Sequence, residues 1–334
     1  MREKNQRIDF IDTAKGIPLL FVLYLHICVC YPGHPYITSD INKVVGTFFM
    51  PVYFMLSGLF FSSKDSFPIW IKKKSKRLLV PYCFFYIVTY LLNGFTVNLL
   101  GIDTKSGFDW KGIFSVFHSD VFPNCTTWFL LALFWGNLMF YLIDKYFKNW
   151  WTKLFAVIAM FGCGVACSKI GFNIPLYIDS AMSMLPFLLL GYYLKKKEFL
   201  NSIWGGQKLL FLVLFIVLAV IDILTAQSVS LINNYLGNPI QYLLGALTGS
   251  LAVIYISAFV QKIPVITYLG RNSLVVLCVH GYVLNVVTIV LKKTPIDMVC
   301  GSVIALIIVS LSFYLIVPLF QHYLPWAIGE NKKN

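Results

Sequence analysis

The stretch that decides the fold is Asp12–His26, DTAKGIPLLFVLYLH. It is apolar over most of its length, yet it opens with an acid and a base and carries a histidine near its far end. On an α-helix Asp12, Lys15 and His26 fall on one face, with Lys15 about 16 Å from His26 along the axis. Ionisable groups inside a membrane span are rare and usually mark a functional path or site. The simpler alternative is an interfacial Asp12–Lys15 ion pair, with His26 bonded to a neighbouring helix.

The composition of the whole chain also indicates a membrane protein. Its 334 residues are 58% hydrophobic and 12% charged, with a mean hydropathy of +0.76, whereas a soluble domain is about a quarter charged. The net charge of +13 comes from basic clusters between apolar runs, so we expect no nucleic-acid partner. The eight cysteines form no CxxC pair and no Cys/His group with zinc spacing, so we expect no metal site.

The apolar runs predict the number of spans and their direction. A membrane helix needs about 20 mostly apolar residues. If both termini lie on one side, that side receives 20 of the 27 Lys and Arg residues and the other side six, with Lys15 left out. The positive-inside rule then places both termini in the cytoplasm. We therefore expect an all-α polytopic protein of the cell membrane with about ten spans, near 13–32, 44–62, 78–100, 127–144, 152–169, 174–194, 208–225, 239–260, 268–290 and 298–324.

The domain organisation follows from these spans. We expect a single membrane domain over residues 1–334, with its helices between 13 and 324. A short cytoplasmic tail at 325–334 would follow.

A second histidine lies in the ninth expected span, YLGRNSLVVLCVHGY (268–282). Both the first and the ninth span start from the cytoplasm, so His26 and His280 should lie at similar depth. Ser273 falls on the same helical face as His280. Two histidines at one depth favour a shared cavity over two independent packing roles.

Two further stretches carry candidate site residues. FFMPVYFMLSGLFF (48–61) offers Ser57 as a partner for the His26 imidazole and Gly58 for close helix approach. KKKSKRLLVPYCFF (72–85) places a dense basic cluster against the third span. Arg77 at the edge of this span suits phosphate, but the cluster equally suits anchoring to anionic lipid, and both interpretations stay open.

Together these segments resemble the membrane-bound acyltransferase family 3 and, within it, the fucose-4-O-acetyltransferase-like branch. The resemblance rests on RIDFIDTAKGIPLLFVLYLH, FFMPVYFMLSGLFF, KRLLVPY, TWFLLALF and LGRNSLVVLCVHG, in the family's order, and covers almost the whole chain. The family motif of a basic residue, ten residues and a histidine falls on Lys15 and His26. Arg is the more usual base in the wide family and Lys in this branch. The large hydrolase-like domain of some members is not found in this sequence.

The resemblance implies an O-acetyltransferase that takes acetyl-CoA as co-substrate, without a bound cofactor, and modifies a carbohydrate acceptor. It implies His26 as a catalytic residue and, less directly, His280. It implies that the donor is held by Lys15, Arg77, Lys76 and Tyr82, with Asp12, Ser57 and Ser273 in support.

Two mechanisms suit a histidine, which titrates near neutrality. In the first, His26 is the general base on the acceptor hydroxyl while acetyl-CoA donates directly. In the second, His26 carries the acetyl group transiently. The rival function is a transporter or flippase, which the ten spans and the intramembrane Asp179 and Asp222 would suit. A lipid-linked-sugar glycosyltransferase would need acidic residues in the first external loop, which offers only Asp40.

Overall fold

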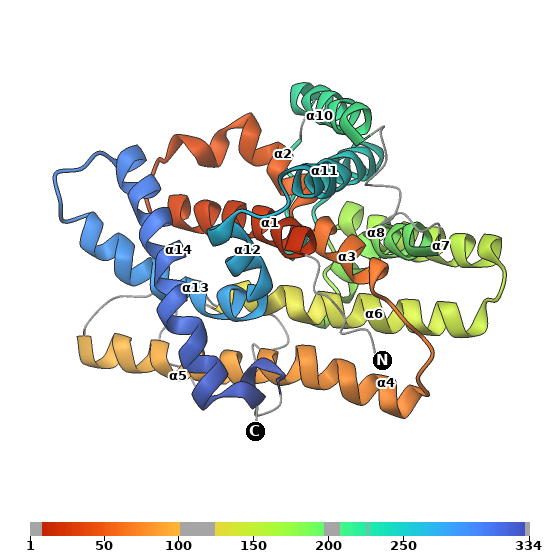
Figure 1. The fold of residues 1–334 in the computed structure, drawn as a ribbon, viewed down its shortest axis with the longest axis horizontal. Helices are drawn as coiled ribbons and strands as arrows, with labels where there is room; N and C mark the ends of the chain where they lie inside the picture. The colour runs from red at the N-terminus through yellow and green to blue at the C-terminus, as the bar shows by residue number, and fades with distance from the viewer. Residues whose placement is uncertain (1–8, 101–123, 197–207, 226, 331–334) are drawn as a thin grey trace.

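The computed structural model describes residues 9–100, 124–196, 208–225 and 227–330. Over these residues the chain is helical, without a strand beyond one isolated bridge, so the all-α prediction is confirmed. The α-helices in chain order (Figure 1) are α1 (Asp9–Val29), α2 (Asp40–Phe48), α3 (Pro51–Leu59), α4 (Phe67–Lys74), α5 (Val80–Leu100), α6 (Trp128–Tyr146), α7 (Trp150–Ile170), α8 (Ile178–Lys196), α10 (Lys208–Thr225), α11 (Pro239–Val260), α12 (Pro264–Arg271), α13 (Ser273–Leu291) and α14 (Met298–Tyr323). Two short segments matter below, the π-helical η2 (Ser75–Leu79) and the 3-10 helix η7 (Pro325–Ile328).

Five of the described helices are long and apolar enough to cross a membrane: α1, α7, α11, α13 and α14. Apolar side chains also cover the outside of the molecule, since Phe155 of α7, Leu210 of α10 and Leu315 of α14 are 74%, 65% and 75% exposed. Apolar surface of this extent needs lipid around it. The chain is therefore an integral membrane protein, and five of its described helices support spans by their length and composition. The count of ten spans stays a prediction.

Two of the expected spans are broken in the structure. The span expected at 44–62 is divided into α2 and α3, because Pro51 starts a new helix. The span expected at 268–290 is divided at Asn272, whose non-helical backbone separates α12 from α13. By contrast, the helix expected at 78–100 begins earlier in the chain, at Phe67. There α4, η2 and α5 follow one another without a break, along the lower edge of Figure 1.

Two pairs of glycines allow the closest helix contacts. A Cβ on Gly270 of α12 would overlap the carbonyl oxygen of Asp12, and one on Gly16 of α1 would overlap that of Ile266. Gly58 of α3 and Gly191 of α8 form the second reciprocal pair. The prediction that Gly58 permits close approach is confirmed. The helix α1, which carries Asp12, Lys15 and His26, thus lies backbone to backbone with α12.

A buried ion pair ties four segments together. The Lys153 ammonium of α7 pairs with the Asp144 carboxylate of α6, and the two side chains are 7% and 6% exposed. Asp144 also accepts hydrogen bonds from Tyr192 of α8 at 2.9 Å and from Ser63 after α3 at 2.5 Å. Each carboxylate oxygen is thus paired, as burial of a charge requires.

The segment expected to be a cytoplasmic tail is partly built into the fold. Ala327 and Ile328 of η7 are buried, and the Trp326 ring lies 5.1 Å from that of Phe84 in α5. A Cβ on Gly329, whose φ is +71°, would meet the carbonyl oxygen of Lys76 at 2.8 Å. The end of the chain therefore packs on η2, and residues 331–334 lie outside the described part.

Candidate active site

The two intramembrane histidines meet between α1 and α13. The ring centres of His26 and His280 are 5.2 Å apart, with their planes at 49°. His280 is fully buried, whereas His26 is half-buried. The two histidines predicted to lie at similar depth are thus neighbours, and His26 is the more exposed of the two. A cavity shared by them stays a prediction.

The hydrogen bonds of His280 determine which of its nitrogens carries the proton. Its Nδ1 lies 3.0 Å from the carbonyl oxygen of Val276, one turn earlier. A carbonyl only accepts, so Nδ1 donates and Nε2 of the neutral ring keeps a lone pair. This Nε2 is buried and has no hydrogen-bond partner among the described residues. The ring is therefore set to accept a hydrogen bond, from the N–H of His26 or from a substrate hydroxyl.

In the first turn of α1, Asp12 lies between two cations. The Lys15 Nζ is 3.8 Å from its carboxylate, and the Arg271 Nε is nearer, at 3.2 Å. Arg271 also pairs with Asp9 at 2.8 Å. The sequence predicted the Asp12–Lys15 pair but not the pair with Arg271. Arg271 is the last residue of α12 and lies within the motif LGRNS (269–273). The Asp12 charge is thus neutralised across the α1–α12 contact.

The position of Lys15 suits a role at the surface. Its ammonium is beyond hydrogen-bond distance of Asp12, and its side chain is 31% exposed. Its carbonyl oxygen accepts a 2.7 Å hydrogen bond from the Tyr53 hydroxyl of α3. The backbone of Lys15 is therefore held by α3, while its side chain faces outward.

The predicted basic site lies on η2 and the start of α5. Lys76 and Arg77 are exposed there, whereas Tyr82, in the first turn of α5, is buried. Tyr82 packs its ring 5.9 Å from that of Tyr86. Lys15 contacts Tyr53 of α3 and Asp12 of its own helix, whereas η2 contacts α4, α5, α6 and Gly329. The described contacts therefore do not bring Lys15 and Arg77 together.

Sequence reasoning missed Lys74, which lies one helical turn before Arg77. Its ammonium donates to Asn137 Oδ1 at 2.7 Å and lies 5.8 Å from the ring centre of Trp70. Burial and the nearby Arg77 guanidinium lower the pKa of Lys74 to about 8. Among the described residues no carboxylate forms an ion pair with it. A half-buried cation of this kind favours an anionic ligand.

The structure places the two supporting serines away from the imidazoles. Ser57 donates to Asn137 Oδ1 at 3.1 Å, so it belongs to the Lys74 cluster. Ser273 is half-buried in the first turn of α13, and Val276 rather than Ser273 bonds to His280. Of the two partners considered for His26, His280 is therefore the one beside it.

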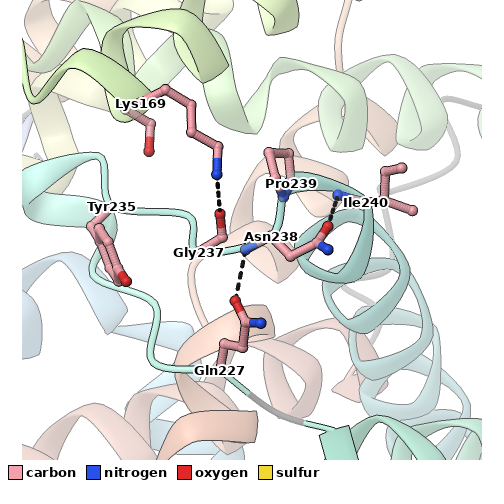
Figure 2. A pocket seen from close by; sticks show the side chains of 8 residues that line it. Lys169, Gln227, Tyr235, Gly237, Asn238, Pro239 and Ile240 are labelled. Atoms are coloured by element: carbon pink, nitrogen blue, oxygen red, sulfur yellow. Dashed lines mark hydrogen bonds between the residues drawn. The ribbon is translucent and has the colours of Figure 1, made fainter.

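A separate hollow opens between the end of α7, the loop 227–238 and the start of α11 (Figure 2). It has a volume of about 660 Å³. Lys169 donates to the Gly237 carbonyl oxygen across it at 3.2 Å, and Gln227 accepts from the Asn238 N–H at 2.8 Å. Its lining residues include none from α1 or α13, so it is distinct from the histidine site.

Comparison with known proteins decides the family. A family model described as an acyltransferase domain, that of acyltransferase family 3, matches residues 8–317. The chain belongs to this family. The matched range contains both histidines of this acyltransferase and its whole basic segment, and supports an acyltransferase in general. Neither curated proteins nor solved structures gave a match.

Proposed function

We propose that this acyltransferase moves an acetyl group from cytosolic acetyl-CoA to a hydroxyl of a sugar, in a cell-envelope polysaccharide or its lipid-linked precursor. The motifs that resemble the fucose-4-O-acetyltransferase-like branch support the acetyl donor and the sugar acceptor. The observation that carries the proposal is the pair of imidazoles inside the α1–α13 contact, 5.2 Å apart. A hydroxyl is a poor nucleophile near neutral pH, and a positioned imidazole is the base that suits it.

In the direct mechanism, His26 removes the hydroxyl proton as the oxygen attacks the thioester carbonyl. The C–S bond then breaks, and the imidazolium returns the proton to the sulfur of coenzyme A. In the acyl-enzyme mechanism, a His26 nitrogen attacks the thioester carbonyl, the C–S bond breaks, and coenzyme A leaves as the thiol with the proton of the imidazolium. The hydroxyl oxygen then attacks the acetyl group, the N–acetyl bond breaks, and the hydroxyl proton passes to the released imidazole. In both, the lone pair on His280 Nε2 orients the N–H of His26, so His280 acts as a positioning residue.

The donor is bound by the cations at the other end of α1 and on η2. Coenzyme A carries phosphates, which Arg77 can bind in a bidentate manner and Lys15, Lys74 and Lys76 as point charges. Tyr82, which is buried in the first turn of α5, supports this basic segment. Lys15 lies about 16 Å from His26 along α1, a distance that the extended arm of the donor spans.

The transporter alternative depends on acids within the membrane. Asp179, in the first turn of α8, is 2% exposed. The side chain of Asp222 lies outside the described part of the structure. Membership of an acyltransferase family favours the enzyme over the transporter.

The test is a thermal-shift titration of the purified protein with acetyl-CoA, in wild type, Lys15→Ala, Arg77→Ala and His26→Ala. Ligand at 100 times its Kd stabilises by about 2.7 kcal/mol. We expect a saturable shift in wild type and His26→Ala, and a weaker one in the two cation variants. No shift at millimolar acetyl-CoA would contradict the proposal.

A second experiment separates the two mechanisms. The protein is mixed with radiolabelled acetyl-CoA and quenched rapidly, and protein-bound label is counted. Label that is present in wild type and lost in His26→Ala supports the acyl-enzyme. Its absence, together with normal transfer, supports direct attack.

A further inference from the structure

Beyond the histidine pair, further polar side chains lie close together just after the end of α1 and along the last turns of α13. We call Cys30, Tyr31, Asn285, Thr288 and Lys292 the distal seam. The Cys30 thiol donates to Asn285 Oδ1 at 3.6 Å and also bonds to the Thr288 side chain. The Lys292 ammonium lies 5.3 Å from the ring centre of Tyr31. The seam thus runs from the imidazoles to the end of α13 that is opposite to Asp12.

Polar atoms without partners lie at both ends of the seam. Next to His26 there is the buried Nε2 of His280. At the other end there is the buried hydroxyl of Tyr31, which a Cβ on Gly301 of α14 would meet at 3.3 Å. Neither atom has a hydrogen-bond partner among the described residues. Buried polar atoms in native proteins are nearly always paired with protein, water or ligand. Within a membrane the need is stronger, because lipid offers no partner. With His280 Nε2 accepting from His26, a ligand that carries hydroxyl groups would supply the partner that the Tyr31 hydroxyl lacks.

Asn285 is the central polar group of the seam. It is half-buried within α13, one of the five helices apolar and long enough to span a membrane. Its Oδ1 accepts from Cys30, and none of the hydrogen bonds given for the described residues uses its NH₂ group. An amide that faces lipid is costly, so this NH₂ group calls for a polar partner. Its two N–H donors suit sugar oxygens.

We infer that the distal seam is the acceptor-binding site, and that Asn285 is an acceptor-binding residue. The acceptor is a polyhydroxylated molecule that enters from the Lys292 end. Asn285 donates to one of its oxygens, while a neighbouring hydroxyl reaches His26. Cys30, which contacts Asn285, follows His26 by four residues, about one helical turn, so one ligand can reach both His26 and Asn285. This inference rests on the proposed function, since it names the route of the acceptor in that reaction.

The first test needs no catalysis. Full-length protein in sealed vesicles of known orientation is treated with a charged, membrane-impermeant maleimide, and modified cysteines are located by peptide mass. Cys28 and Cys278 are internal controls, because both are buried and lie on the same two helices. We expect Cys30 to react at least tenfold faster than either control, and only from the side where α1 ends. Equal rates at Cys30 and Cys278 would overturn the inference.

The second test uses membranes of the native host, which contain the acceptor without its having to be identified. Incorporation of radiolabelled acetyl groups from acetyl-CoA into envelope material is measured for Asn285→Leu and Val286→Leu. Val286, the neighbouring residue, is 64% exposed and serves as the matched control. Loss of the hydrogen bond in Asn285→Leu is expected to lower incorporation about tenfold, with an unchanged acetyl-CoA thermal shift.

The outcomes of the two tests are distinguishable. Equal incorporation by Asn285→Leu and Val286→Leu would remove Asn285 from acceptor binding. A wild type that neither incorporates acetyl nor shifts with acetyl-CoA would refute the proposed function. In that case the reactivity of Cys30 still decides whether the seam is open to a polar ligand.

Discussion

At the scale of single residues, the site depends on which groups have protein partners and which do not. The Nδ1 of His280 donates to the Val276 carbonyl, and its Nε2 has no hydrogen-bond partner among the described residues. His26 is half-buried beside it. Lys74 is held by an amide rather than by a carboxylate. His280 therefore offers a lone pair, His26 offers a base, and Lys74 offers a positive charge.

The role of His280 can be tested by replacing its imidazole with side chains that do or do not accept a hydrogen bond. We expect His280→Phe to lower kcat while leaving the KM for acetyl-CoA unchanged, because the orientation of His26 is lost and the donor site is not. His280→Gln should recover part of kcat, since its amide oxygen accepts a hydrogen bond. His26→Ala should lose about 10²- to 10⁴-fold, the usual contribution of a general base. Equal kcat in the Phe and Gln variants would argue against positioning through a hydrogen bond.

Lys74 predicts how donor binding depends on pH. Its pKa of about 8 in the folded protein lies below the ordinary value of 10.5. The ammonium is therefore charged below pH 8 and neutral above it. We expect the Kd for acetyl-CoA, measured by calorimetry, to rise as the pH increases through about 8. Lys74→Gln should bind more weakly and lose this step. Lys72→Gln, on the exposed side of α4, should keep it.

At the scale of elements, the structure depends on helices that approach closely at glycines. The α1–α12 contact positions Asp12 against Arg271, and the break at Asn272 sets the start of α13 and hence the depth of His280. A change in this contact would therefore reach the imidazoles through the backbone.

The glycine contact predicts an effect on stability. Gly270→Ala is expected to destabilise the protein by about 1–3 kcal/mol, because the new methyl group would overlap the Asp12 carbonyl oxygen. Gly162 on α7 is the matched control, since a Cβ there meets nothing within 4 Å. Gly162→Ala should be neutral or stabilising by about 0.5–1 kcal/mol, the helix preference for Ala over Gly. The measurement is the Tm in detergent, and equal Tm values would contradict the predicted overlap.

The sequence predicted some elements well and others poorly, for identifiable reasons. Long uninterrupted apolar runs, such as those of α1, α11 and α14, predicted helices within a few residues of their ends. The breaks at Pro51 and Asn272 were missed, because proline and polar residues are also tolerated inside membrane helices. The meeting of His26 and His280 followed from depth alone. Arg271 and Lys74 were missed, because their partners lie far away in the sequence.

At the scale of the whole molecule, the two ends of α1 carry different chemistry. One end is rich in ion pairs around Asp12, and the other joins the distal seam. In the proposed function, the donor and the acceptor therefore approach one imidazole from opposite ends of the same helix. Coenzyme A then need not cross the membrane.

The buried Asp144–Lys153 pair between α6 and α7 predicts an effect on the free energy of unfolding. Removing one partner leaves an uncompensated buried charge, so Lys153→Met is expected to cost about 3–5 kcal/mol. Asp144→Asn combined with Lys153→Met should recover much of this loss, because no buried charge is left. Denaturant or thermal unfolding in detergent measures both. A double variant as unstable as Lys153→Met alone would show that the loss has another origin.

The packing of η7 on η2 also has a consequence for the timing of synthesis. Lys76 and Arg77 leave the ribosome some 250 residues before Gly329, whose backbone lies against theirs. The surface that is proposed to receive the donor is therefore completed only when the last helix has been inserted. A nascent chain arrested before residue 325 would contain both histidines and all of the basic cluster, but it would lack η7, which packs against that cluster.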